Sequence, residues 1–121
     1  LKIVPKPVSV QAGEGYFEVT PETKIYLTNE SADLQKAADY LQNLFAQSAG
    51  FSPAIEQTDA PDTQKGIILT TQGAEAGLGN EGYTLEATAE RVVIRGGAAS
   101  GVFYGVQTLR QMLPNAIESK T

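Results

Sequence analysis

The segment from residue 81 to residue 114 constrains the fold more than any other part of this 121-residue chain. Apolar and polar residues alternate over residues 83–87, and an apolar run returns after a short turn. This alternation predicts a β-hairpin with one face in the core. Gly96 and Gly97 then end the second strand, and apolar residues recur at helical spacing up to Pro114. The segment therefore predicts a hairpin and a helix that share one apolar face.

Two glycines lie four residues apart inside this predicted helix, at Gly101 and Gly105. Each costs about 1 kcal/mol relative to alanine in a helix interior. Such a cost is usually offset where two backbones must approach closely. We therefore predict that this side of the helix presses on the sheet or on another helix.

The rest of the chain predicts further strands and one more amphipathic helix. Short strands are expected where β-branched and aromatic residues cluster, at residues 8–11, 16–19, 23–28, 51–57 and 66–71. The continuous apolar run at 66–71 indicates a central strand that is covered on both faces. Helical periodicity predicts a helix over residues 31–48, with Asn29 or Ser31 as its cap and Gly50 as its left-handed end. This interpretation gives one α+β domain.

The chain contains no cysteine and no histidine. The missing cysteine excludes a disulfide framework and a thiolate nucleophile, and the missing histidine excludes Ser-His and Cys-His catalytic pairs. A formal net charge of −5 and scattered basic residues argue against nucleic acid or an anionic membrane as the partner. No apolar run reaches the roughly 18 residues of a membrane span. The residue types and their spacing indicate no catalytic, cofactor-binding or metal site.

Three sets of residues resemble parts of active sites, and each has a simpler structural interpretation. Residues 77–82 match the pattern G-x-G-x-x-G, but a strand follows where a dinucleotide site needs a helix N-terminus. Asp59 and Asp62 lie in a hydrophilic loop with no apolar surroundings. Glu86 and Glu90 lie on the wet face and turn of the predicted hairpin. We interpret all of them as solvated surface residues.

Tyr104 is the aromatic residue that periodicity places away from the core. It shares a stripe at positions i, i+3 and i+7 with Gln107 and Gln111. Two interpretations stay open: a half-buried tyrosine at a helix edge, or a contact with a neighbouring domain, because amphipathic aromatics favour interfaces. The stripe Tyr104, Gln107 and Gln111 is therefore our candidate domain interface.

Several motifs carry a family resemblance. The chain reads Glu-Gly-Tyr-Thr-Leu at 81–85, Ile-Arg-Gly at 94–96, and Gly-Val-Phe-Tyr-Gly-Val-Gln-Thr-Leu-Arg-Gln-Met-Leu-Pro at 101–114, and it opens with Ile-Val-Pro-Lys-Pro at 3–7. These motifs resemble the non-catalytic N-terminal domain that precedes the barrel in family 20 of the glycoside hydrolases, the β-N-acetylhexosaminidases. The resemblance covers both ends of the chain, and the middle matches in pattern only.

The resemblance implies an α+β fold in which two α-helices pack on one face of a mostly antiparallel sheet, as a two-layer sandwich. It also implies a single accessory domain over residues 1–114, with residues 115–121 starting a linker to a catalytic (β/α)8 barrel. In the family, the barrel carries an adjacent Asp-Glu pair, in which Glu is the general acid and Asp orients the 2-acetamido group. This chain has no such pair, and a barrel needs about 200 further residues. The chain alone is expected to be inert.

The implied parent enzyme removes terminal N-acetylhexosamine residues from glycans, and its barrel is the expected partner of this domain. The implied location is the periplasm or the extracellular space of a bacterium, after removal of a signal peptide. No cofactor, nucleic acid or membrane is expected to bind, and this domain is not expected to bind glycans itself. Two alternatives stay open: the equivalent domain of a family 84 hexosaminidase, which the Pro-Lys-Pro opening disfavours, and a glycan- or protein-binding module in its own right.

Overall fold

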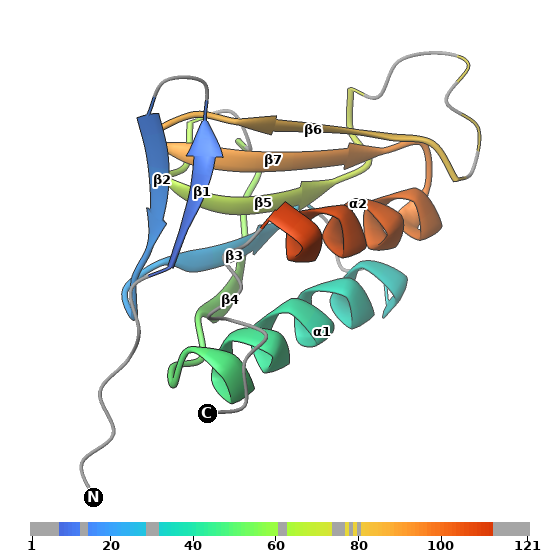
Figure 1. The fold of residues 1–121 in the computed structure, drawn as a ribbon. Helices are drawn as coiled ribbons and strands as arrows, with labels where there is room; N and C mark the ends of the chain where they lie inside the picture. Colours follow the sequence, from blue (N-terminus) through green and yellow to red (C-terminus); the bar gives the residue numbers. More distant parts are fainter. Residues whose placement is uncertain are drawn as a thin grey trace, which may run out of the picture.

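The computed structural model describes residues 8–12, 15–28, 32–60, 63–73, 77, 79 and 81–112. The elements in chain order are β1 (Val8–Ala12), β2 (Gly15–Val19), β3 (Lys24–Leu27), α1 (Ala32–Ser48), β4 (Ala54–Gln57), β5 (Gly66–Thr70), β6 (Tyr83–Ala87), β7 (Arg91–Gly96) and α2 (Ala99–Met112). Figure 1 shows a sheet layer with both helices on one face, as the sequence predicts. The α+β class is therefore confirmed.

The prediction of a mostly antiparallel sheet is wrong. Among the described residues, five strands form one sheet in the order β4-β3-β5-β7-β6. Strand β3 pairs in parallel with β4 and β5, and β5 pairs in parallel with β7. Within this sheet, only β6 and β7 pair antiparallel. The sheet is thus mixed and mostly parallel.

The connections between the strands explain this outcome. Helix α1 carries the chain from the end of β3 back to the start of its neighbour β4, so these two strands run in the same direction. Residues 58–65 return the chain to the start of β5, on the other side of β3. Strand β6 then runs back along the edge, and a tight turn places β7 parallel to β5.

The core lies between the sheet and the two helices. Strand β5 is buried along its whole length, which confirms the prediction of a central strand covered on both faces. The largest fully buried apolar side chains come from both layers, and they are Phe45, Ile25, Leu27, Leu34, Leu41, Ile67, Ile68, Leu69, Ile94 and Leu109. The buried hydroxyls of Thr28 and Thr70 satisfy each other through a hydrogen bond of 2.8 Å between their Oγ1 atoms.

The predicted hairpin forms between β6 and β7. In the β6–β7 pair, Leu85 lies opposite Ile94 and Ala87 lies opposite Val92, so the apolar members share the helix-facing side as expected. Strands β1 and β2 form a separate antiparallel pair, and Phe17 from β2 joins the core.

Helix α1 agrees with the predicted range, and its end is formed as predicted. Gly50 has a φ of 89°, in the left-handed region that suits glycine, and its N–H donates to the carbonyl of Phe45 over 3.1 Å. The predicted cap residues Asn29 and Ser31 lie outside the described residues, as do Pro114 and the opening at residues 1–7.

An ion pair joins the exposed side of the edge strand β4 to β3. Lys24 Nζ lies 2.7 Å from Glu56 Oε2, and this hydrogen bond, reinforced by the negative charge of Glu56, raises the pKa of Lys24 above its ordinary value. The stabilisation that this pair contributes is present at neutral pH and is lost as the pH rises through the pKa of Lys24.

We expect the substitution Glu56→Gln to lower the pKa of Lys24 toward its ordinary value, because the carboxylate that favours the charged amine is gone. An NMR titration of the Lys24 side chain measures this change. The variant Glu86→Gln removes an exposed carboxylate of strand β6 and should leave the Lys24 titration where it is. An unchanged Lys24 pKa in Glu56→Gln would contradict the assignment.

Candidate functional site

The outward surface of the helix layer holds the candidate interface. Tyr104 is 47% exposed and is the one large hydrophobic side chain among the described residues that is exposed. Gln111 is also exposed, and Gln107 is partly buried. The helical spacing therefore placed the stripe correctly on the solvent side of α2. Whether it forms a domain interface stays a prediction.

Packing on the opposite side of α2 fixes this orientation. Val102, Val106 and Leu109 are fully buried against the sheet. A side-chain hydrogen bond between Tyr83 Oη of the edge strand β6 and Thr108 Oγ1 of α2 adds a polar contact between the strand and the helix. With these side chains turned inward, Tyr104 must face outward.

Gly105 packs closely against the sheet. A Cβ atom built at Gly105 would lie 2.3 Å from Cγ2 of Ile94 and 3.2 Å from Cδ2 of Tyr83. For Gly105, the prediction that this side of the helix presses on the sheet is confirmed, and the surface that it packs on is the β6–β7 hairpin.

A cavity of about 400 Å³ lies between the first turns of the two helices. It is lined by Asp33 and Lys36 of α1 and by Ala99, Ser100, Phe103 and Tyr104 of α2. Figure 1 shows that α1 and α2 begin at the same end of the helix layer. Tyr104 is the member of the predicted stripe that lines this cavity, whereas Gln107 and Gln111 do not.

Sequence reasoning missed the α1 side of this cavity. Asp33 and Lys36 fell on the polar face of the predicted helix, where a charged residue is usually just solvated. The helical pattern gives the outward face of each helix separately, but it does not say which turns of the two helices lie side by side.

An aromatic contact joins the two helices beside the cavity. The rings of Tyr40 in α1 and Phe103 in α2 lie 5.4 Å apart between centroids, with 60° between their planes. Tilted pairs of this kind are favourable beyond their buried area. The Phe103 wall of the cavity is therefore held by a neighbour on the other helix.

A second, more polar cavity of about 330 Å³ is lined by the end of β2, the turn between β2 and β3, the start of β5 with the residue before it, and the β6–β7 turn. Its lining includes the carboxylates Glu18, Glu22 and Glu90 together with Lys65. Glu18, Glu22, Glu90 and Lys65 are all exposed. The arrangement is a hydrated surface hollow with charges of both signs.

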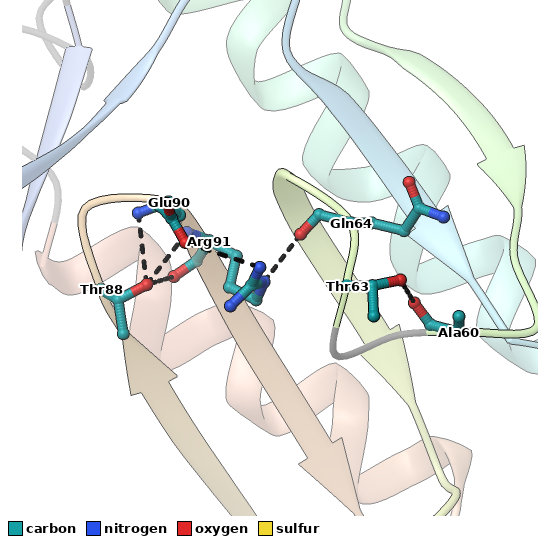
Figure 2. Close-up of polar contacts among 6 residues, drawn as sticks. All are labelled: Ala60, Thr63, Gln64, Thr88, Glu90 and Arg91. Carbon is teal, nitrogen blue, oxygen red and sulfur yellow. Dashed lines mark hydrogen bonds and ion pairs between the residues drawn. The ribbon is translucent and has the colours of Figure 1, made fainter.

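The β6–β7 turn beside this cavity is tied to the loop before β5. Figure 2 shows Arg91 donating from Nε to the carbonyl of Gln64 over 2.7 Å, while Oγ1 of Thr88 accepts from the backbone N–H groups of Glu90 and Arg91. In the same loop, the Thr63 hydroxyl donates to the carbonyl of Ala60. These contacts fix a turn and a loop and present no reactive group.

The other residues considered from the sequence do not converge on a site. Asp59, Glu86 and Glu90 are exposed, and Asp62 lies outside the described residues. Gly77 and Gly79 are exposed, with φ values of 95° and 70°, and strand β6 follows them where a nucleotide site needs a helix. Within the described part of the chain, no group of three His, Cys, Asp or Glu residues could hold a metal ion. None of its helices combines the length and apolar character that crossing a membrane requires.

Comparison with known proteins adds curated and structural relatives. A curated β-hexosaminidase of Porphyromonas gingivalis is 34% identical over 119 residues, which cover 98% of this chain and 15% of that protein. The solved structure of the family 20 β-N-acetylhexosaminidase of Streptomyces coelicolor A3(2) is 34% identical, with a TM-score of 0.75, and it matches 98% of this chain and 23% of its own. The Streptomyces plicatus N-acetyl-β-hexosaminidase in complex with Thio-NAglucal is 30% identical, with a TM-score of 0.72, over 97% of this chain and 22% of its own.

The chain thus spans less than a quarter of the length of each of these relatives. A protein-family model, glycosyl hydrolase family 20, domain 2, matches residues 1–121. The resemblance read from the motifs at 81–114 is confirmed: this chain belongs to the domain 2 family of the family 20 glycosyl hydrolases.

Proposed function

We propose that this chain is the non-catalytic domain of a β-N-acetylhexosaminidase and that it supports the catalytic barrel of the same polypeptide. The observation that carries the proposal is the family match over residues 1–121. In addition, the match to this chain covers only 15% to 23% of the length of the relatives. The parent enzyme then removes terminal N-acetylhexosamine residues from glycans. The proposal includes a domain over residues 1–114, a linker from residue 115, and a periplasmic or extracellular location.

The helix layer supplies the surface for this role. The sheet side of α2 is occupied by the core, whereas Tyr104 and Gln111 are exposed and Gln107 is partly exposed. A large amphipathic aromatic residue on an otherwise polar helix face is typical of a protein contact. We place the barrel contact on this side of the domain.

The full-length polypeptide is expected to hydrolyse a chromogenic N-acetylglucosaminide, and the 121-residue chain alone is expected not to. Deletion of this domain should lower the thermal stability or the soluble yield of the remaining enzyme, because the barrel surface that it covers becomes exposed. Turnover by the isolated chain would overturn the non-catalytic assignment. A deletion variant with unchanged stability, yield and activity would overturn the supporting role.

A further inference from the structure

We propose that the cavity between the first turns of α1 and α2 receives an apolar side chain from the catalytic part of the same polypeptide, with Tyr104 as the central contact. This inference rests on the proposed function and makes it specific. It places the centre of the interface on the cavity shared by the two helices and away from the Gln107 and Gln111 end of the stripe.

The lining of the cavity favours an apolar occupant. Phe103 and Ala99 supply apolar wall, and Tyr104 supplies a half-exposed ring at its edge. Two of the polar lining residues, Asp33 and Ser100, already take part in other interactions. A sugar would need unsatisfied donors and acceptors that converge on it, whereas an apolar side chain needs only surface to cover.

The cavity wall is held in place before anything docks. Phe103 packs against Tyr40 of the other helix. The first turn of α2 is closed by the hydrogen bond from Val102 N–H to the carbonyl of Ala98, at 3.2 Å. A wall that is already fixed loses little conformational freedom on binding, which favours affinity.

Lys36 places a second condition on the partner, which concerns the charge beside its apolar side chain. It lines the same cavity from α1, it is exposed, and it forms no ion pair with another described residue. A charge at the rim of an apolar contact orients the partner more than it adds affinity. The occupant is therefore an apolar side chain with a carboxylate beside it.

The catalytic part is the occupant that the comparisons favour. In each relative described above, more than three quarters of the polypeptide lies outside the part matched by this chain. A partner held in the same polypeptide has a high effective concentration, so a contact built on one aromatic anchor is sufficient. A second copy of this chain would lack that advantage.

Photo-crosslinking in the full-length polypeptide tests the position of the contact. The variant Tyr104→p-benzoylphenylalanine keeps an aromatic ring at the cavity, and the same substitution at Gln111 is the matched control on the same helix. The Tyr104 variant is expected to crosslink within one polypeptide to a peptide of the catalytic part that contains apolar and acidic residues. A crosslink from Gln111 alone would overturn the inference and leave the proposed domain contact intact. Crosslinks between two polypeptides in place of a crosslink within one would overturn both.

Limited proteolysis of the full-length polypeptide tests the energetic role. Tyr104→Ala is expected to speed the release of this domain at least about tenfold, because buried aromatic anchors dominate interface energies. Lys36→Glu should speed it by a smaller factor, and Gln111→Ala by less than about twofold. Far-UV circular dichroism checks that each variant is folded.

Equal effects of Tyr104→Ala and Gln111→Ala would overturn the central place of the cavity. If no variant changed the rate and neither probe crosslinked to the catalytic part, the barrel contact on this side of the domain, and with it that part of the proposed function, would fail as well.

Discussion

Replacing Gly105 by leucine is expected to lower the free energy of unfolding by about 3 kcal/mol, through overpacking of the interface between α2 and the β6–β7 hairpin. The Cβ atom alone would lie 2.3 Å from Cγ2 of Ile94, far inside the 3.5–4.0 Å at which carbon atoms attract. Ile94 is fully buried in the core, so its side chain can move away only by displacing packed neighbours. The gain of about 1 kcal/mol in helix propensity does not offset this clash.

Urea unfolding followed by circular dichroism measures the loss. Gln111→Leu is the matched control, since it adds the same side chain to the same helix at an exposed position and should change the stability by no more than about 0.5 kcal/mol. Equal stability of Gly105→Leu and the unsubstituted chain would mean that the helix does not need a glycine here.

The elements themselves were predictable because their patterns are local. The alternation over residues 83–87 and the helical spacing within 31–48 depend on which face of each element packs on the core. The structure buries the apolar face of α1 and packs the partly buried Leu85 and Ala87 of β6 against the core. The two glycines of the last helix were also informative. A residue that lowers helix propensity inside a regular helix indicates that something else requires it, and for Gly105 this is Ile94.

Strand direction was not predictable in the same way. The side-chain pattern within one strand does not say which strand it pairs with, and the family resemblance led to the prediction of a mostly antiparallel sheet. Two features favoured parallel pairing: β5 is apolar along its length, and a 17-residue helix separates β3 from β4. Parallel neighbours require a crossover of about a dozen residues or more, and α1 supplies one.

The candidate site also has one part that the sequence predicts and one part that it does not. The exposure of Tyr104 follows from the periodicity of one helix, so the sequence predicts it. The cavity depends on how two helices lie against each other, which is set by contacts such as Tyr40 with Phe103 between residues far apart in the chain. The contribution of Lys36 to this surface follows only from that pairing.

The joint between β7 and α2, residues 96–98, connects the core to the proposed interface. The substitution Gly96→Ala is expected to lower the stability of the domain and to weaken the proposed interface. A Cβ atom at Gly96 would lie 2.6 Å from the backbone nitrogen of Val102 and 2.7 Å from the carbonyl oxygen of Ala98. These two atoms form the hydrogen bond that closes the first turn of α2. Because the clash is with backbone, the turn must shift, and we expect a loss of about 2 to 3 kcal/mol in the free energy of unfolding.

The neighbouring Gly97→Ala is the matched control. Gly97 is exposed and has no positive φ, and its contact with the carbonyl of Gly82 uses only its backbone N–H. Its alanine variant should therefore unfold at nearly the same urea concentration as the original chain.

The first turn of α2 carries Ala99 and Ser100 of the cavity wall. In the full-length polypeptide, Gly96→Ala should therefore also release this domain faster under proteolysis, whereas Gly97→Ala should not. Gly96→Ala with unchanged stability and unchanged release would show that the joint tolerates a side chain and that the cavity wall does not depend on it.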